Sequence, residues 1–552
     1  MKSRVPVLAA AATLLAAAAV TAAPPTTAAA ATPRPVVRVL PLGDSITYGV
    51  GSCTGAGYRL PLQGMAETGG RYHLDFVGSA QPAGHMVDPQ NEGHPGKEIA
   101  EIGDGVRQGW ITAARPDVVL LHIGINDLAN NDRPTEAPDR AKALIDQIFA
   151  AQPGVTVIMQ GLIPTSQGWG SSPANLSFLI ADYNTQLLRF QATEQQQGKH
   201  FLFVEAPGLT PLGQSAPAEL ADALHPNDAG YRRLAQNFST ALDQAWGARW
   251  FTGTAGLPNP AAQPDTVHLV TVAPAPDRAL RNTEGDYAAG SWSAWQGMDR
   301  GSITEVASAA TRSTNHVFAV TTSGQLLEKD GNYATGQWSS WFQPDIGPLR
   351  EGVVPAAIAA SSYDDVVHLV AVGTDGHLYN SDGDWAAGHW NGWTDHGGSF
   401  TRVASAMTAD RVNHIFAIES GSGLVKELDG DYCHGAWSNW QTAGKNGLAA
   451  LDVAASGDGD TVHLSAIRTD GGWSTTDGDF DTRSWNDWTP MGDRNLERIA
   501  SASANHVNHV FFTTTDHRLG ERDGDFTTGS WSAWGAPTGA GDAIGISAAF
   551  TL

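Results

Sequence analysis

Cysteine is almost absent from this chain of 552 residues, in which only Cys53 and Cys433 occur. So few cysteines exclude zinc sites built on several thiolates. The two residues lie far apart in the sequence and either bridge two domains or remain as free thiols. Because a disulfide requires a close and specific geometry, we expect two free thiols.

Positive charge is also scarce. Lys and Arg number 33 against 57 Asp and Glu, which gives a formal net charge of -24, and no basic tract occurs. Such a chain does not neutralise phosphates, so nucleic acid is excluded as a partner. Charged residues make up only 16% of the chain, whereas Gly (62) and Trp (18) are abundant. This composition is typical of a sheet-rich secreted protein, and the length predicts two or three domains.

Long apolar runs are missing except near the N-terminus, so no membrane span of about 20 apolar residues is predicted. Lys2 and Arg4 precede an Ala-rich apolar run over about Val5–Ala22, and small residues follow it. This order is typical of an export signal with a cleavage site. The alternative, an N-terminal membrane anchor, is disfavoured because the run is short and rich in alanine. We therefore interpret residues 1–31 as a signal peptide and the protein as secreted and extracellular.

Residues 32–251 alternate β-like runs with helical patterns. The continuous apolar run DVVLLHIG is typical of a buried parallel strand, and one long helix is expected over KEIAEIGDGVRQGWITAA. Alternation of this kind predicts a three-layer α/β domain with a parallel sheet. Ligands of such domains bind at the carboxyl ends of the strands, where Ser45 and Asn126 are expected.

A Gly-, Pro- and Ala-rich linker over residues 252–264 separates this half from a repetitive half over residues 265–552. Six W-x-x-W pairs recur there, and their first tryptophans lie 46, 52, 47, 48 and 46 residues apart. An Asp-Gly or similar pair, which we interpret as a tight hairpin turn, precedes each of them. A period of about 48 residues with several short strands predicts an all-β propeller with one blade for each repeat.

The C-terminal segment AIGISAAFTL resembles the strand that opens an internal repeat, and the first repeat lacks such a strand. We therefore expect the C-terminus to complete the first of six blades and close the ring; a seventh, degenerate blade is the alternative. The tryptophans are expected mainly to pack within the blades. The DGDY-type segments lack the twelve-residue pattern of a calcium loop, so neither a metal nor a cofactor is expected.

Residues suited to nucleophilic serine catalysis lie in the first half. Such catalysis needs a hydroxyl, a base, a carboxylate that orients the base, and donors for the oxyanion. The segment GDS places Ser45 after a strand-like run, and DALH places Asp222 three residues before His225. The segment GIND supplies the amide of Asn126, and GHPG supplies the N–H of Gly96. Without the other segments, GDS would be an ordinary strand-to-helix turn.

The segments GDSITYG, GHPG, GIND and DALH resemble, in order, the four motif blocks of the SGNH (GDSL) hydrolases. The resemblance covers about residues 36–246 and implies a flavodoxin-like α/β fold. It implies that Ser45 is the nucleophile, His225 the base and Asp222 its orienting partner. It also implies an oxyanion hole made by the Ser45 backbone N–H, Gly96 and Asn126.

Longer segments such as NEGHPGKEI and LHPNDAGYRRLA resemble the third carbohydrate-esterase family, whose members remove acetyl groups from xylan. The chain departs from that family's usual GTND at Ile125, and the insertion VGSCTGAG is expected to reshape the pocket. We interpret His94 as structural or substrate-facing and Asp127 as the cap of a turn, and neither as catalytic. The repeats of the second half resemble the PLL-like lectin propellers, which implies glycan binding but names no binding residue.

We therefore expect a serine esterase that hydrolyses carboxylic esters, in particular O-acetyl groups on polysaccharides such as xylan, and whose propeller keeps it on the polymer. Three alternatives remain open: a lipase or long-chain esterase, a lectin whose hydrolase half has lapsed, and a propeller that serves as a protein-interaction platform.

Overall fold

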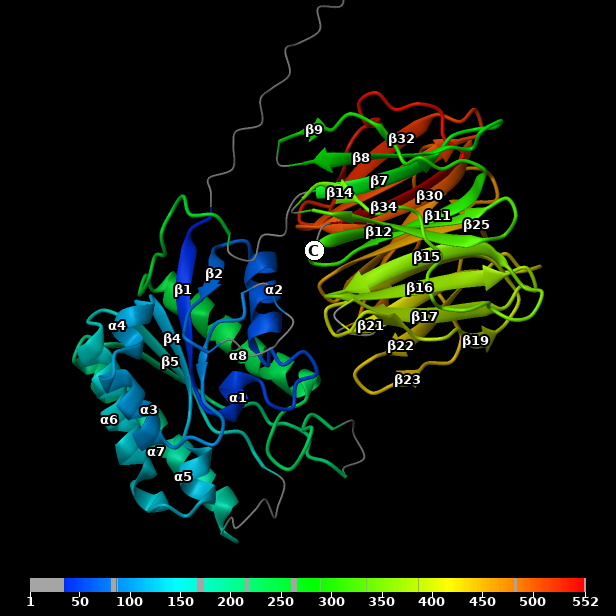
Figure 1. Ribbon diagram of the computed structural model, residues 1–552. Coiled ribbons are helices and arrows are strands. Elements are labelled where there is room, and N and C mark those ends of the chain that lie inside the picture. Colours follow the sequence, from blue (N-terminus) through cyan, green and yellow to red (C-terminus); the bar gives the residue numbers. More distant parts are fainter. Residues whose placement is uncertain are drawn as a thin grey trace, which may run out of the picture.

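A computed structural model describes residues 34–80, 86, 88–165, 173–213, 218–259, 266–287, 289–333, 335–385, 387–480 and 484–550. They form an α/β unit and an all-β unit that lie side by side, with α2 (Arg59–Gly69) and α8 (Asp228–Gly247) on the side of the α/β unit that faces the second (Figure 1). The expected signal peptide and residues 260–264 of the expected linker lie outside the described residues. In the described ranges, no helix is both long and apolar enough to cross a membrane.

The α/β unit is built on a parallel sheet with the strand order β2-β1-β4-β5-β6, and a short β3 pairs with the end of β1. Every residue of β4, VVLLH, is buried, as expected for a central parallel strand covered on both faces. This sheet confirms the expected fold class. Its strands are β1 (Val36–Gly43), β2 (His73–Phe76), β3 (Glu92–Gly93), β4 (Val118–His122), β5 (Thr156–Gln160) and β6 (His200–Val204).

Helices cover both faces of the sheet. The apolar side chains of α2 and α8 pack on one face, and those of α3 to α7 pack on the other. The prediction of one long helix after GHPG is wrong, because Gly109 adopts a φ of 103° and separates α3 from α4. The helices not yet located are α1 (Ser45–Tyr48), α3 (Ile99–Arg107), α4 (Trp110–Ala114), α5 (Ile125–Ala129), η1 (Pro134–Glu136), α6 (Ala137–Ala151) and α7 (Leu176–Gln196).

The all-β unit is a propeller of six antiparallel sheets. The C-terminal β34 (Gly545–Phe550) pairs with β7 (Thr266–Val272), so the end of the chain completes the first blade and closes the ring, as expected. The remaining strands of that blade are β8 (Leu280–Asp286), β9 (Ser291–Trp292) and β10 (Gln296–Gly297).

The other five blades repeat this arrangement in chain order. The second and third are β11 (Ile303–Ala310), β12 (Thr314–Thr321), β13 (Leu326–Asn332) and β14 (Gln337–Trp338), then β15 (Pro355–Tyr363), β16 (Val366–Gly373), β17 (Leu378–Asp384), β18 (His389–Trp390) and β19 (Thr394–Gly397). The fourth is β20 (Phe400–Met407), β21 (Val412–Glu419), β22 (Val425–Asp431), β23 (Ala436–Trp437) and β24 (Gln441–Thr442). The last two are β25 (Ala450–Asp458), β26 (Thr461–Arg468), β27 (Trp473–Asp479), β28 (Ser484–Trp485) and β29 (Thr489–Pro490), then β30 (Leu496–Ala504), β31 (Val507–Thr514), β32 (Leu519–Asp525) and β33 (Ser530–Trp531).

The Asp-Gly pairs are not hairpin turns, and that interpretation is wrong. Each lies inside the third strand of its blade, as Asp330 and Gly331 do in β13. Gly331 pairs with Trp338, and a Cβ at Gly331 would lie 2.8 Å from that indole. The glycine is therefore required because the first tryptophan of each W-x-x-W pair packs directly on the strand.

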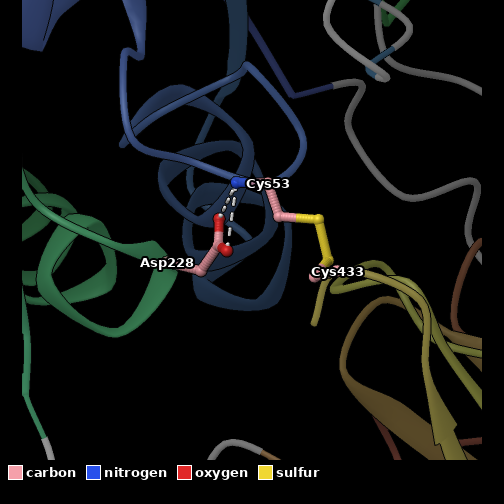
Figure 2. A group of neighbouring side chains, drawn as sticks. All are labelled: Cys53, Asp228 and Cys433. Atoms are coloured by element: carbon pink, nitrogen blue, oxygen red, sulfur yellow. Dashed lines mark hydrogen bonds between the residues drawn. A yellow bond between two sulfur atoms is a disulfide. The ribbon is translucent and has the colours of Figure 1, made fainter. Parts of the chain in front are cut away.

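The expectation of two free thiols is also wrong. Cys53, in the loop between α1 and α2, forms a disulfide with Cys433 of the fourth blade, with the Cα atoms 5.6 Å apart (Figure 2). Beside this bridge, a cavity of about 2280 Å³ separates the α/β unit from the propeller. Residues of both units line it, among them Arg232 and Asp460, whose side chains form an ion pair of 3.5 Å.

Candidate active site

The carboxyl end of β1 presents Ser45. The strand ends at Gly43, where a Cβ would collide with the backbone of His122, and Ser45 begins the short helix α1. Asp44 caps this helix, since its Oδ1 accepts the N–H of Ile46 at 3.0 Å. Burial, reinforced by the charge of nearby Asp127, raises the pKa of Asp44 to about 7 although the Ile46 N–H acts in the opposite direction. The hydroxyl of Ser45 therefore stands at the edge of the sheet next to a buried carboxyl group.

His225 and Asp222 come from the loop before α8 and reach the same edge. The Nε2 atom of His225 lies 2.9 Å from Ser45 Oγ, and its Nδ1 atom lies 2.8 Å from Asp222 Oδ2. The other carboxylate oxygen of Asp222 accepts the backbone N–H groups of Leu224 and His225, each at 2.7 Å. Partial burial acts to raise the pKa of Asp222, but the hydrogen bonds from His225 and Leu224 outweigh it and hold that pKa below its usual value. The three side chains thus form one continuous hydrogen-bonded chain.

The segments GHPG and GIND lie beside the hydrogen-bonded side chains of Ser45, His225 and Asp222. The N–H of His94 donates to the carbonyl of Gly43 at 2.9 Å and so fixes the GHPG segment against the end of β1. Asn126 donates from Nδ2 to the carbonyl of Lys97, the residue after Gly96, at 2.8 Å. Gly96 is exposed and has a φ of 78°, and a Cβ there would meet no atom within 4 Å. The structure therefore connects Asn126 to the loop that carries Gly96.

Sequence reasoning missed the role of Asp127 in this connection. It does not cap a turn alone: its carboxylate accepts the N–H of Ile99 at 3.0 Å and both Nε and Nη2 of Arg140, at 3.1 and 2.7 Å. Burial raises the pKa of Asp127, although Arg140 and the Ile99 N–H act to lower it. An arginine between the buried alanines of APDRAKALI was the available signal, because a cation on an apolar helix face needs an anionic partner.

His94 and Ile125 have structural surroundings. The His94 ring stacks on Trp110 with centroids 4.3 Å apart, and its Nε2 lies 2.9 Å from a carboxylate oxygen of Glu92. Ile125, where the resembling family has threonine, is 1% exposed and belongs to the apolar core. Its side chain therefore replaces a polar group without leaving an exposed apolar surface.

Three acidic side chains lie close together here, namely Glu98, Asp127 and Asp132. The guanidinium of Arg140 already lies against Asp127 and, at 3.7 Å, Asp132, so the group carries its own cation. A hydroxyl next to an imidazole that a carboxylate orients has the arrangement of a serine nucleophile and its base, which needs no metal ion.

Residues 42–233 match the GDSL-like Lipase/Acylhydrolase family. The α/β unit is a GDSL-type ester hydrolase domain. A "Multidomain esterase" of Ruminococcus flavefaciens is 28% identical over 221 residues, which cover 36% of this chain and 27% of that protein. A "Putative endoglucanase X" of Acetivibrio thermocellus is 28% identical over 140 residues, 25% of this chain and 54% of that protein. The chain thus spans between a quarter and about half of the length of these curated relatives.

Solved structures resemble each half of the chain separately. A Clostridium thermocellum family 3 carbohydrate esterase is 28% identical, with a TM-score of 0.32, over 39% of this chain and 98% of its own. The BP39L lectin from Burkholderia pseudomallei is 19% identical, with a TM-score of 0.36, over 52% of this chain and 87% of its own. The GDSL-type domain thus has carbohydrate-esterase neighbours, and the propeller has lectin neighbours.

Proposed function

We propose that this chain is a secreted serine esterase that removes O-acetyl groups from a polysaccharide such as xylan. The observation that carries the proposal is the contact of 2.9 Å between Ser45 Oγ and His225 Nε2, two atoms that lie 180 residues apart in the sequence. Nothing in the packing of a sheet edge requires a histidine to meet a serine there, whereas nucleophilic catalysis does.

In this proposal, Ser45 Oγ attacks the ester carbonyl while His225 Nε2 takes the hydroxyl proton. Asp222 holds the Nδ1 proton of His225, so that Nε2 is the free acceptor, and it stabilises the imidazolium that forms. The tetrahedral oxyanion accepts hydrogen bonds from the N–H groups of Ser45 and Gly96 and from Asn126. Because the carbonyl of Lys97 takes one of the two Nδ2 hydrogens of Asn126, the other is left for the oxyanion.

The tetrahedral intermediate then collapses to an acyl-enzyme, which water hydrolyses. His225 donates its proton to the departing sugar oxygen, and the acyl group remains on Ser45 Oγ. A water molecule then loses a proton to His225 and attacks the acyl carbonyl. Acetate leaves, and the proton returns from His225 to Ser45 Oγ.

The propeller supports a polymeric substrate. We propose that it binds glycan chains and thereby raises the concentration of acetyl groups near Ser45. Linking a binding module to an enzyme has this effect without any new contact at the active site. The lectin neighbours of the propeller suggest this role, and no individual binding residue is assigned.

Acetate release from a panel of acetylated polysaccharides, including xylan, tests the substrate class. We expect acetate from the wild-type protein and none above background from Ser45→Ala or His225→Ala. Full activity in either variant would refute the mechanism, and faster hydrolysis of p-nitrophenyl octanoate than of the acetate would favour a lipase. Sedimentation of the full-length Ser45→Ala variant with insoluble xylan measures glycan binding without turnover; no binding to any polysaccharide of the panel would remove the role of the propeller.

A further inference from the structure

The loop over residues 49–57, GVGSCTGAG, connects the nucleophile helix α1 to α2 and folds back on itself. A Cβ at Gly49 would collide with the carbonyl of Gly55, so the two backbone segments touch directly. The N–H of Ser52 donates to the carbonyl of Gly49 at 3.1 Å, and the N–H of Gly55 donates to the carbonyl of Ser52 at 3.2 Å. This insertion is therefore a compact element held together by its own backbone contacts.

The loop contacts both members of the proposed catalytic pair. The N–H of Val50 donates to the carbonyl of Ser45 at 3.0 Å. Gly51 lies against the base: a Cβ at Gly51 would be 2.9 Å from the Cβ of His225 and 2.6 Å from the carbonyl oxygen of Pro226. The loop therefore sits between the nucleophile helix and the base segment, and any shift of the loop acts on both.

Cys53 attaches this loop to α8. Its N–H points between the two carboxylate oxygens of Asp228, each 3.1 Å away, as Figure 2 shows. Asp228 is the first residue of α8 and follows His225 by three positions. Burial raises the pKa of Asp228, although the Cys53 N–H acts to lower it. The same residue that carries the disulfide thus also ties the loop to the helix behind the base.

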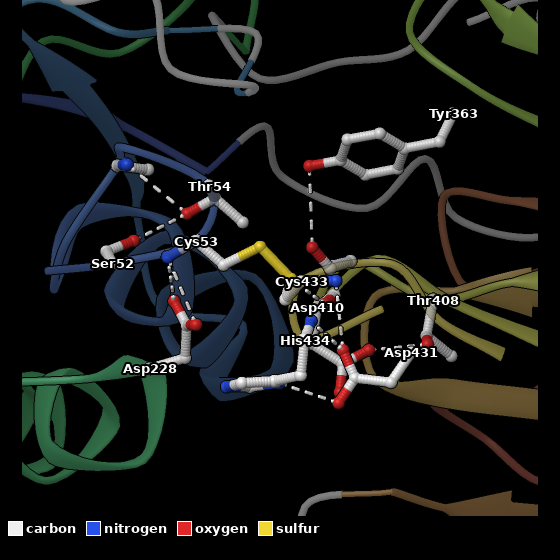
Figure 3. Close-up of a disulfide and its surroundings, with 12 residues drawn as sticks. Ser52, Cys53, Thr54, Asp228, Tyr363, Thr408, Asp410, Asp431, Cys433 and His434 are labelled. Atoms are coloured by element: carbon white, nitrogen blue, oxygen red, sulfur yellow. Dashed lines mark hydrogen bonds and ion pairs between the residues drawn. A yellow bond between two sulfur atoms is a disulfide. The ribbon is translucent and has the colours of Figure 1, made fainter. Parts of the chain in front are cut away.

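The propeller end of the bridge is a fixed turn. The N–H groups of Cys433 and His434 both donate to Asp431 Oδ1, at 2.9 and 3.0 Å (Figure 3). The preceding residue, Tyr432, donates its hydroxyl proton to Asp382 of the neighbouring blade at 2.7 Å. Cys433 is therefore held by two blades of the propeller and does not end in a mobile loop.

We propose that the propeller positions the catalytic pair through the Cys53–Cys433 disulfide: it clamps the loop over residues 49–57, which sets the distance between Ser45 and His225. Cys53 and Cys433 are positioning residues in this proposal, which rests on the proposed esterase function. The disulfide attaches the two units covalently, in addition to contacts between them such as the ion pair of Arg232 and Asp460. The insertion thus serves domain coupling in addition to shaping the pocket.

The test compares Cys433→Ser, Cys53→Ser and the double variant with wild type in the full chain. We expect kcat for p-nitrophenyl acetate to fall about tenfold with KM changed less than twofold, because displacing a reacting group by about 1 Å costs up to about 100-fold. The double variant should match either single variant, since both remove the same bridge. His434→Ser, in the same turn but outside the disulfide, is the matched control and should keep the wild-type kcat.

Two further measurements separate positioning from loss of folded protein. Rates are expressed per active serine, counted by the burst of p-nitrophenol from a phosphonate ester that labels Ser45. Dithiothreitol added to folded wild type should reproduce the lower kcat, because it reduces the disulfide to two thiols while it becomes a cyclic disulfide; reoxidation should restore the rate. An unchanged kcat per active serine in Cys433→Ser would overturn the proposal.

Hydrogen exchange makes the test independent of the esterase activity. We expect faster exchange at residues 49–57 and 221–228 in Cys433→Ser than in His434→Ser, while the strands of the α/β sheet remain unchanged. If wild type hydrolyses no ester, the proposed function fails. The exchange pattern still tests whether the disulfide couples the propeller to the loop over residues 49–57. Identical exchange in the two variants would overturn it.

Discussion

The Asp222→Asn substitution should be more harmful than removal of the whole carboxylate. The oxygen Oδ1 of Asp222 accepts two backbone N–H groups at 2.7 Å, and Oδ2 accepts Nδ1 of His225 at 2.8 Å. In the Asn variant, the amide oxygen must stay with the two backbone donors, so the amide nitrogen faces Nδ1. Nδ1 of His225 must then accept a hydrogen bond from this amide, so the imidazole carries its proton on Nε2, where it can no longer act as base toward Ser45.

The exposure of Asp222 sets the magnitude. In a buried triad, the wrong imidazole tautomer lowers kcat by about 10⁴. Here the side chain of Asp222 is 56% exposed, whereas that of His225 is 15% exposed. Water therefore competes for Nδ1, and we expect a loss of about 10²–10³ in kcat for Asp222→Asn. In Asp222→Ala, water can reach Nδ1 and neither imidazole tautomer is imposed. We therefore expect kcat to fall by a factor of only about 10–10².

Steady-state hydrolysis of p-nitrophenyl acetate by the three proteins measures this difference, with kcat expressed per phosphonate-titrated serine. KM should change little, because Asp222 lies behind the imidazole and contacts no part of the ester in the proposed mechanism. The reasoning is refuted if Asp222→Asn matches wild type or turns over faster than Asp222→Ala.

Three further predictions concern the oxyanion donors, their support and the propeller. Asn126→Ala should lower kcat on p-nitrophenyl acetate by about 10²–10³, as loss of one oxyanion donor does, and a loss below threefold would remove Asn126 from that role. Arg140→Gln leaves the buried carboxylate of Asp127 without its cation, so we expect a lower midpoint in urea unfolding, by about 3 kcal/mol in the free energy of unfolding; an unchanged midpoint would contradict it. Burial raises the pKa of Glu427 to about 8 in the folded propeller, whereas the unfolded chain has the usual glutamate pKa. Between the unfolded and the folded pKa, the folded propeller therefore binds more protons than the unfolded chain. The stability that Glu427 contributes should be complete below the unfolded pKa and decline as pH rises through neutrality. Differential scanning calorimetry at several pH values should therefore find that the midpoint temperature of the propeller depends less steeply on pH in Glu427→Gln than in wild type.

The site was predictable because its chemistry is concentrated in short segments. A polar residue two positions after the glycine that follows a buried strand lies at the carboxyl end of that strand, and this holds for Ser45 and for Asn126. The spacing of Asp222 and His225 within one loop likewise left few arrangements for their side chains.

Contacts that depend on the approach of distant segments were not predictable. Cys53 and Cys433 are 380 residues apart, and neither half of the chain contains a reason for the other to approach it. The break at Gly109 depends on a backbone conformation that helical periodicity does not reveal. The Asp-Gly pairs were misinterpreted because hairpin turns and strands under a tryptophan both require glycine, and only the packing of residues such as Trp338 on Gly331 distinguishes them.

The spacing of about 48 residues conceals a longer repeat in the side chains. In the second strands of successive blades, the second residue is alternately an apolar and an amide side chain: Val267, Asn315, Val367, Asn413, Val462 and Asn508. The third strands alternate in step, with buried glutamates in every second blade: Asn282, Glu328, Asn380, Glu427, Thr475 and Glu521. Asn413 accepts the hydroxyl of Ser361, from the preceding blade, at 3.2 Å and that of Ser405, from its own blade, at 2.7 Å, so it joins neighbouring blades. The side chains therefore repeat with threefold symmetry on a sixfold backbone, because amides such as Asn413 and Asn508 have a hydroxyl partner in the preceding blade. A consensus blade averaged over all six repeats would consequently bury asparagines and glutamates next to positions that do not provide their partners.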